Sequence, residues 1–162
     1  MDRHILIVFS QNSPGVLSRI AGLLRRKLFN IDSLTVGPTK NSAVSQFTIV
    51  ITGEKSNAQK AVCMIQNVVE VLSVTLCDPD SLWIREVVLT RVEIKNEAQY
   101  HQLLSDEKRI LSREIFRDER EVIIELVDTS HQLDSFLARL QKHKIHVIDW
   151  VRSGIIAMQK SS

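Results

Sequence analysis

The chain has 162 residues, of which 44% are hydrophobic and 25% charged, and its formal net charge is +2. This is the composition of an ordinary soluble globular protein, long enough for one domain or for two small ones. The balanced charge argues against a protein that binds nucleic acid or a membrane surface. No run approaches the roughly 18 apolar residues that a membrane-spanning helix needs, so no segment is expected to cross a bilayer.

The N-terminal segment and the cysteines bear on where the protein works. The apolar run "HILIVF" near the N-terminus is too short for a secretory signal peptide. Cys63 and Cys77 lie in the apolar segments "AVCMIQ" and "VTLCDP". In a chain without an export signal, two such cysteines are expected to be reduced, structural thiols. We therefore expect a cytoplasmic protein.

The first half of the chain predicts the order strand, helix, strand, strand, helix, strand. Val16, Leu17, Ile20, Leu23 and Leu24 recur at helical spacing. "NIDSLTVGPT" and "AVSQFTIVITG" are expected to pair as a hairpin, because a few polar residues join them. The expected elements are a strand at 4–9, a helix at 15–27, strands at 30–39 and 43–53, a helix capped by Ser56 or Asn57, and a strand at 70–77.

The same order returns after "DPDS", the one convincing break in the chain. Leu133, Phe136, Leu137 and Leu140 mark the last helix by their spacing. The expected elements are a strand at 83–94, a helix at 97–109 carrying Tyr100, Leu103 and Leu104, strands at 110–116 and 120–127, a helix capped near Thr129 or Ser130, and a strand at 145–151. We expect Trp83 and Trp150 to pack in the core of this second half.

A βαββαβ unit of about 70–80 residues is typical of the ferredoxin-like arrangement, in which two helices lie on one face of an antiparallel sheet. The sequence therefore predicts an α+β protein with two such domains in tandem. The expected domains are an N-terminal domain at 1–77, a linker at 78–82 and a C-terminal domain at 83–162.

The first and third strands carry more apolar residues than such a sheet needs. With helices on one face only, a strand should alternate apolar and polar residues. "ILIVF" is instead apolar at every position, and "FTIVIT" is nearly so. Part of the second face or of the sheet edge must therefore be covered. Since a domain of this size buries little by itself, we expect a second chain to pair with it.

The segment "QNSPGVLSRI" at the start of the first helix has two interpretations. Ser13 suits the N-cap and Pro14 the first helical position, so these residues are explained by a plain helix start. Gly15 lowers helix propensity, but its backbone N–H is unobstructed, and free amides at a helix start attract a carboxylate. Asn12 adds a side-chain oxygen that can accept a hydrogen bond from an ammonium group. A site for a free amino acid is therefore the second interpretation.

The segment "ILIVFSQNSPGVLSRIAGLLRRKLFNIDSLTVGPT" closely resembles the start of the small, regulatory subunits of acetolactate synthase, also called acetohydroxyacid synthase. "SQFTIVITG", "VLSVTLCDPDSLWIREVVLTRV", "LDSFLARL" and "VRSGIIAM" extend the resemblance over the whole chain. The resemblance is strongest in 4–94 and looser in 95–140. It implies that the first domain is an ACT domain, a ferredoxin-like amino-acid sensor.

In that family, two small subunits pair their ACT domains edge to edge, and the feedback amino acid, usually valine, lies at the interface. The resemblance implies that Asn12 and Gly15 of one chain hold the effector. Asn30 of the partner chain would reach its ammonium and carboxylate groups. The effector-binding residues that the resemblance implies are Asn12, Ser13, Pro14, Gly15, Val16, Leu17, Asn30 and Ile31.

The resemblance also implies a function without catalysis in this chain. Family members bind the large subunit of acetolactate synthase, raise its activity and make it sensitive to valine. That enzyme condenses two pyruvates, or pyruvate with 2-ketobutyrate, in the synthesis of valine, leucine and isoleucine. Thiamine diphosphate, FAD and magnesium belong to the large subunit, so no cofactor, metal or catalytic residue is expected here.

Two departures from the family pattern concern the expected site. The family commonly has "RGYNI" where this chain has "KLFNI", so Leu28 replaces a helix-terminating glycine and Phe29 replaces a tyrosine. Because leucine in the left-handed conformation costs roughly 1 kcal/mol or more, a different helix end is expected. In the second domain, "LVDTSHQLD" lacks the Thr-Gly pair that often precedes the last helix.

Other function classes have weaker support. The chain lacks GxSxG, HExxH and CxxC motifs, which argues against an autonomous enzyme. "HKIH" at 143–146 is expected to be a solvated turn and not a metal site. "VLSRIAGLLRRKLFNIDSL" resembles a helix–turn–helix, but the part after Phe29 is patterned as a strand. A stand-alone amino-acid sensor without an enzyme partner stays open as the alternative.

Overall fold

The computed structural model describes residues 2–96, 98 and 110–160, and these form two compact units. The first unit is Met1–Trp83 together with Ile155–Ser162, and the second is Ile84–Gly154. Among the described residues, no helix combines the length and the apolar character that crossing a membrane requires. Each unit is a sheet with helical cover, so the predicted α+β class is confirmed.

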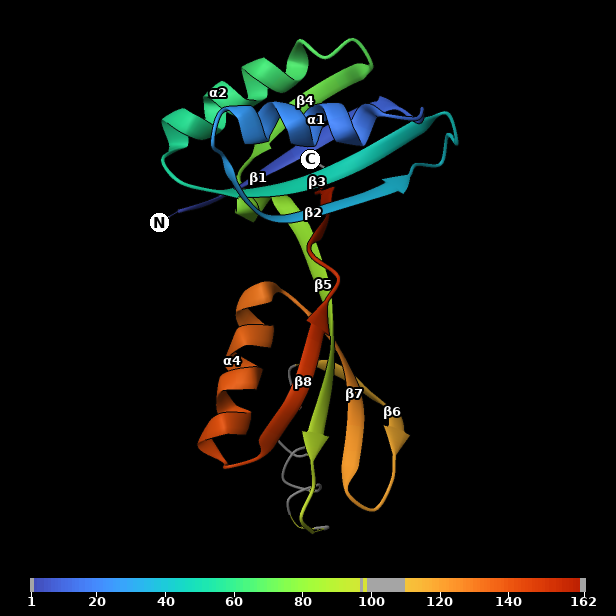
Figure 1. Cartoon of the computed structure of the whole chain (residues 1–162), viewed down its shortest axis with the longest axis vertical. Coiled ribbons are helices and arrows are strands. Elements are labelled where there is room, and N and C mark those ends of the chain that lie inside the picture. The colour runs from blue at the N-terminus through green and yellow to red at the C-terminus, as the bar shows by residue number, and fades with distance from the viewer. Residues whose placement is uncertain (1, 97, 99–109, 161–162) are drawn as a thin grey trace. The chain divides into compact units, whose positions relative to one another are not determined.

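The first unit is an antiparallel sheet with strand order β2-β3-β1-β4, and β1 and β3 are its central strands (Figure 1). The predicted order strand, helix, strand, strand, helix, strand is confirmed, and the ends of α1 and of the strands lie within two residues of those expected. The predicted cap of α2 at Ser56 or Asn57 is wrong, because Glu54 is the N-cap and both residues lie inside the helix. The elements are β1 (Arg3–Gln11), α1 (Val16–Arg26), β2 (Asn30–Pro38), β3 (Val44–Thr52), α2 (Lys55–Gln66), β4 (Val71–Cys77), the short 3₁₀ helix η1 (Pro79–Ser81) and β9 (Ile156–Gln159).

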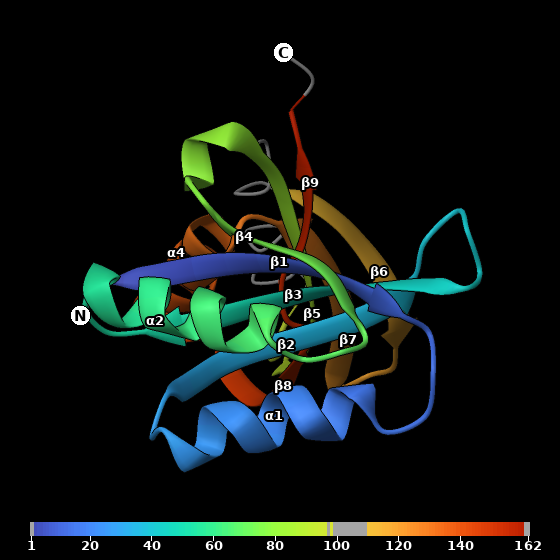
Figure 2. The same ribbon diagram turned by 90° about the horizontal axis from the view of Figure 1, so that it is seen from above.

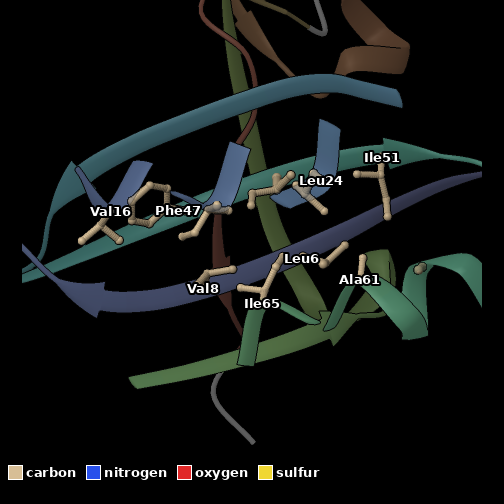
Figure 3. Packing of buried hydrophobic residues seen from close by; sticks show 11 residues of the cluster. Leu6, Val8, Val16, Leu24, Phe47, Ile51, Ala61 and Ile65 are labelled. Atoms are coloured by element: carbon tan, nitrogen blue, oxygen red, sulfur yellow. The ribbon is translucent and has the colours of Figure 1, made fainter. Parts of the chain in front are cut away.

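Both helices of the first unit cover one face of the sheet. Successive side chains of a strand point to opposite faces, so Leu6 and Val8 of β1 share the face that meets the helices. Figure 3 shows them packed with residues of both helices, and each fully buried aliphatic side chain contributes about 1.5–3 kcal/mol. The buried cluster is Leu6, Val8, Val16, Ile20, Leu24, Phe47, Ile49, Ile51, Ala58, Ala61 and Ile65.

The opposite face of this sheet is covered by the C-terminal segment of the same chain. Ile5, Ile7 and Val50 point away from the helices, yet they are at most 5% exposed. Residues 155–160, which we call the strap, lie on this side of the sheet, opposite the helices (Figure 1). The first and third strands carry more apolar residues than one helix-covered face needs, and the sequence predicts a second chain that covers them. The strap lies on that face instead. The apolar face therefore no longer requires a second chain to cover it, and dimerisation stays a prediction.

The strap was not expected as a separate element. The sequence assigns 83–162 to the C-terminal domain and ends the last strand at 151, whereas β9 packs with the first unit and pairs with β5. Figure 2 shows β9 leading to the C-terminus beside this sheet. Trp83, expected in the second core, belongs to the first unit and is 61% exposed. Trp150 is also exposed, so the core positions expected for both tryptophans are wrong.

Helix α1 ends in a Schellman motif in spite of the missing glycine. The N–H of Leu28 donates to Arg25 O at 3.0 Å, and the N–H of Phe29 donates to Leu24 O at 3.1 Å. Leu28 adopts the left-handed conformation with φ 59°, and its side chain is 92% exposed. The expectation of a different helix end is therefore wrong. Two hydrogen bonds and the packing of Phe29 against the core offset the strain of a left-handed leucine.

The second unit has the same strand order as the first, β6-β7-β5-β8. One face meets α4 through a buried cluster that includes Val88, Ile124 and Phe136. Except for residue 98, the helix expected at 97–109, with Tyr100, Leu103 and Leu104, lies outside the described residues. The elements are β5 (Leu82–Glu93), which begins in the first unit, then β6 (Leu111–Arg117), β7 (Glu121–Asp128), α4 (Ser130–Lys142) and β8 (His146–Arg152).

A buried carboxylate ties the elements of the second unit together. Glu86 of β5 is 5% exposed and accepts two hydrogen bonds from Arg152 of β8, at 2.9 and 2.8 Å. Ser130, at the start of α4, donates to the same carboxylate at 2.7 Å. Arg152 also donates to Asp134 at 2.6 Å. Burial acts to lower the pKa of Arg152, but hydrogen bonds and charges of Glu86 and Asp134 outweigh it and hold that pKa above its usual value.

Candidate functional site

The turn between β1 and α1 is fixed from both sides. At the end of β1, the N–H of Gln11 donates to Glu70 O at 2.8 Å, next to β4. The N–H of Asn12 donates to Ala43 O at 2.8 Å, in the turn between β2 and β3. These backbone bonds hold the residues before α1 in one position, which is what a small binding site requires.

Gly15, and not Ser13, is the N-cap of α1. It has φ 88°, and the N–H of Arg19 donates to its carbonyl at 3.0 Å. No side chain caps this helix, so the predicted roles of Ser13 as N-cap and Pro14 as first helical residue are wrong. The left-handed backbone explains the glycine, because other residues adopt it at a cost. A Cβ at this position would have space, since its nearest neighbour would be Arg19 Nη2 at 3.8 Å.

The start of α1 therefore presents unobstructed backbone donors. The first N–H groups of a helix have no partner within it, and here neither a side-chain cap nor an acidic residue of the first turn takes their place. The helix dipole adds partial positive charge at the same point. This geometry suits a carboxylate. It arises because the left-handed backbone of Gly15 starts the helix and no side chain caps the N–H groups that follow.

The amide of Asn12 is oriented by the neighbouring turn. Its Nδ2 donates to Ser42 O at 2.9 Å, and this leaves Oδ1 as the acceptor end of the side chain. Asn12, Ser13 and Pro14 are all exposed, so the turn lies at the surface. A hydrogen-bond acceptor thus stands beside a helix start that attracts a carboxylate. A free amino acid carries both matching groups: an ammonium that can donate to the acceptor and a carboxylate that can bind at the helix start.

The other predicted site residues fall into different environments. Val16 is 2% exposed and packs in the core, so only its backbone can face a ligand at the turn. Leu17 is 42% exposed on the next position of α1. Asn30, exposed at the start of β2, donates from Nδ2 to Asp32 at 3.1 Å. Ile31 follows it and packs partly against the core.

Asn12 and Asn30 lie at opposite ends of the sheet in one chain. Asn12 is bonded beside Val44, where β3 begins, whereas Asn30 pairs with Thr52, where β3 ends. Eight residues of extended strand between those positions span about 26 Å. One small amino acid cannot reach both side chains of the same chain. A site that uses both therefore needs two chains.

Arg19, one turn into α1, lies beside Gly15 and is not among the site residues predicted from the sequence. Its guanidinium forms an ion pair with Glu70, whose backbone also anchors Gln11. The Oε2 atom of Glu70 is buried without a hydrogen-bond partner among the described residues. A cavity of about 480 Å³ borders both side chains. The signal in the sequence was the spacing of four residues between Gly15 and Arg19, which puts the cation over the helix start.

A larger cavity, of about 740 Å³, lies at the far end of α1 and not at this turn. Its lining includes Phe29, Thr52 and the first residues of α2. The chemistry predicted from the sequence, an uncapped helix start beside an amide oxygen, is at the other end of the helix. We assign the candidate site by that chemistry, because volume alone does not identify a ligand.

The two histidines of "HKIH" do not form a metal site in the described part of the chain. His146 Nδ1 lies 3.3 Å from Glu93 Oε2, and no cluster of three or more metal-ligating side chains occurs among the described residues. The cysteines are both free thiols, with Cys63 exposed and Cys77 buried.

Comparison with known proteins places both units in one family. A family described as "AHAS small subunit-like ACT domain" matches residues 6–73, and one described as "Small subunit of acetolactate synthase" matches residues 85–161. The probable acetolactate synthase small subunit of Archaeoglobus fulgidus is 30% identical, covering 99% of this chain and 98% of that protein. The acetolactate synthase small subunit of Haemophilus influenzae is also 30% identical, covering 98% of this chain and 96% of its own.

A solved structure agrees over the full length. The acetolactate synthase small subunit of Thermotoga maritima superposes with a TM-score of 0.86 at 26% identity, covering 100% of this chain and 99% of that one. The similarity therefore extends through both units. This chain belongs to the family of acetolactate synthase small subunits, and its first unit is the ACT domain of that family.

Proposed function

We propose that this protein is the regulatory subunit of acetolactate synthase. It binds the large, catalytic subunit, raises its activity and makes it sensitive to feedback inhibition by valine. Relatives named as small subunits of this enzyme match nearly the whole chain, which supports the partnership. In this proposal thiamine diphosphate, FAD and magnesium act in the catalytic partner, and none is assigned to this chain.

The geometry at the start of α1 carries the effector part of the proposal. The uncapped N–H groups that follow Gly15 receive the carboxylate of valine, and Oδ1 of Asn12 accepts a hydrogen bond from its ammonium group. Leu17 and Ile31 are partly exposed and offer apolar contact to a branched side chain. The turn is small and fixed by backbone bonds, so it favours a ligand of amino-acid size.

The separation of Asn12 from Asn30 supports a homodimer. The edge strand β2 begins at Asn30 and ends next to the turn that holds Asn12. If two β2 edges pair antiparallel about a two-fold axis, Asn30 of the partner subunit comes close to Asn12. Each dimer then has two equivalent effector sites at the seam.

Regulation follows from linkage between effector binding and the arrangement of subunits. An effector that binds one arrangement better than another shifts the equilibrium toward it. A coupling of roughly 1–3 kcal/mol changes the population ratio about 5- to 150-fold. In our proposal, the arrangement that valine favours does not support full activity of the catalytic subunit.

The test is acetolactate formation by the cognate catalytic subunit, with and without this chain, at rising valine concentration. We expect the chain to raise activity and valine to lower it again. Asn12→Ala and Asn30→Ala should each raise the valine concentration for half inhibition roughly tenfold or more, because each removes a hydrogen bond to a charged group. Activation without valine should not change.

The control is Asn57→Ala, an exposed asparagine in the first turn of α2 that is not among the predicted effector residues. It should alter neither activation nor inhibition. Loss of activation in Asn12→Ala or Asn30→Ala, with folding intact, would show that the two roles are not separable. A chain that binds valine but never changes the enzyme's activity would instead be a stand-alone amino-acid sensor.

A further inference from the structure

The strap is held on the first sheet by hydrogen bonds as well as by burial. Thr35 Oγ1 donates to Ile155 O at 2.6 Å, and the N–H of Ile155 donates to Ser33 Oγ at 3.3 Å. Gln46 Nε2 donates to Ala157 O at 2.8 Å. Ile155 and Ala157 are 5% and 8% exposed. The strap thus crosses from β2 to β3 on the face opposite the helices.

The strap pairs with β5 through β9, but it buries few side chains. Its alternate residues Ile156 and Met158 are 59% and 71% exposed, so half of its apolar side chains add little to docking. Beyond them, Lys160 bonds to the segment before β5, through its N–H to Ser81 O and its Nζ to Asp80 O. A short segment with few buried side chains is the kind of element that opens locally without global unfolding.

The strap meets β2 next to the predicted effector residues. Ser33 and Thr35 lie three and five positions after Asn30 on the same strand. They supply two of the side-chain hydrogen bonds that hold the strap. Any shift of β2 at the seam therefore acts on the hydrogen bonds of Ile155.

The strap follows directly on the last residue of the second unit, Gly154. Ser153 is fixed in that unit, because its N–H donates to Val87 O at 3.0 Å and its Oγ accepts from the N–H of Val87 at 3.0 Å. Ile155 is fixed on β2. Only Gly154 lies between them, with φ 79°. The backbone of the strap therefore continues directly into the residues that are bonded to β5.

We propose that docking of the strap on the first sheet and binding of the effector at the seam stabilise each other, so that the strap passes the effector signal from β2 to the second unit through Gly154. This inference rests on the proposed function, since it needs an effector at the seam. By linkage the coupling is reciprocal: the factor by which valine stabilises the docked strap is the factor by which docking strengthens valine binding. Breaking the strap's hydrogen bonds must then weaken valine binding at a distance.

Cys77 supplies a built-in reporter of strap docking. Its thiol is buried and interacts with the side chain of Gln159 in the strap, and burial raises its pKa. When the strap lifts, the thiol becomes accessible, so it reacts faster with a thiol reagent. The chain has two cysteines, and the other, Cys63, is exposed. Cys63→Ser leaves Cys77 as the single reactive thiol.

The experiment measures labelling of Cys77 by a disulfide reagent in the full chain carrying Cys63→Ser, with and without saturating valine. Valine binding to the same protein is measured by calorimetry. We expect valine to slow labelling several-fold. Thr35→Val, which keeps the shape of the side chain but removes its hydrogen bond to Ile155, should speed labelling about fivefold. It should also weaken valine binding, by at most about fivefold.

The matched control is Val36→Thr, next to Thr35 on the same strand. Val36 is 47% exposed and lies on the other face of β2, so this change alters the strand without removing a hydrogen bond to the strap. This variant should leave both the labelling rate and the valine affinity near those of the parent. If Val36→Thr changed them as much as Thr35→Val does, the effect would be a general weakening of β2 and the inference would fail.

The outcomes separate this inference from the proposed function. Valine that binds in calorimetry but leaves the labelling rate unchanged, or raises it, would overturn the linkage and leave the effector site standing. No calorimetric binding of valine would overturn the valine site, and the linkage with it. Slower labelling with valine, together with weaker binding in Thr35→Val alone, would support both.

Discussion

The two sheets of this protein have the same strand order but differ in what lies on the face away from the helices. In the first unit that face is apolar and buried: Val50 is fully buried and Ile7 is 4% exposed. In the second unit, Leu89 and Val151 pair with each other on the corresponding face, and they are 37% and 57% exposed. The same strand order thus occurs with a buried and with an open second face, and in the first unit the strap is hydrogen-bonded across the buried one.

The units differ in their polar anchors as well. The second unit holds its helix and two strands together with a buried carboxylate and Arg152, whereas the core of the first consists of aliphatic side chains, Phe47 and alanines. A buried ion pair adds little net stability, but removing one partner is costly. We therefore expect the second unit to be the more sensitive to single polar substitutions, and the first to substitutions on its covered face.

The chain offers one tryptophan in each unit for following these effects separately. Trp83 belongs to the first unit and Trp150 to the second, and the sequence has no others. Trp83→Phe therefore gives a protein whose fluorescence reports on the second unit, and Trp150→Phe one that reports on the first. Both are exposed, so neither substitution removes a core residue.

The largest effect is expected for Arg152→Leu. It leaves the buried carboxylate of Glu86 with Ser130 as its remaining side-chain donor, so the free energy of unfolding of the second unit should fall by about 3–5 kcal/mol. Urea unfolding followed by Trp150 fluorescence measures this. Arg91→Leu is the control, since its ion pair with Glu121 is a partly exposed contact of 3.7 Å and should matter by less than about 1 kcal/mol.

The double variant Glu86→Leu with Arg152→Leu sharpens the same test. Because it removes both charges and fills the space with apolar atoms, most of the lost stability should return. If the double variant were as unstable as Arg152→Leu alone, the loss would come from packing of the arginine side chain and not from the unpaired carboxylate.

An intermediate effect is expected for Val50→Thr in the first unit. The substitution keeps the shape but places a hydroxyl under the strap, where burial without a full partner costs about 1–3 kcal/mol. The matched change, Val151→Thr, lies on the open face of the second sheet and should stay within about 0.5 kcal/mol. Urea midpoints from Trp83 and Trp150, respectively, check this. Equal losses would contradict the difference between the two faces.

The smallest effect concerns a feature that the two units share. Both α1 and α4 end in a Schellman motif with a left-handed residue that is not glycine, Leu28 with φ 59° and Lys144 with φ 57°. Leu28→Gly and Lys144→Gly should each raise the free energy of unfolding of their own unit by about 1 kcal/mol or less, since relief of strain is partly offset by the entropy of glycine.

Leu28→Ala is the control for this prediction. It shortens the same exposed side chain but keeps the Cβ that causes the strain, so thermal unfolding should show no gain in stability. If alanine stabilised the first unit as much as glycine, the benefit would come from removing an exposed leucine and not from the backbone.

Local patterns in the sequence were sufficient for most of the fold. Apolar residues at helical spacing placed α1, α2 and α4, and strand patterns with turn residues placed the two hairpins, because these signals depend on neighbours along the chain. Excess apolar residues in "ILIVF" correctly indicated a covered second face. The family was also recognisable, because "NSPGVLSRI" and "FNIDSLTVGPT" are specific to it and the family match includes that region.

Tertiary structure decided what those signals could not specify. A pattern shows that a face is covered but not by what, and here the cover comes from residues more than 100 positions away. The backbone angle of Gly15 replaced the predicted cap at Ser13, because turn geometry depends on the anchors at Glu70 and Ala43. Likewise Leu28 keeps a glycine's conformation because packing of Phe29 holds it there. Long-range contacts, which a single sequence does not display, made each of these choices.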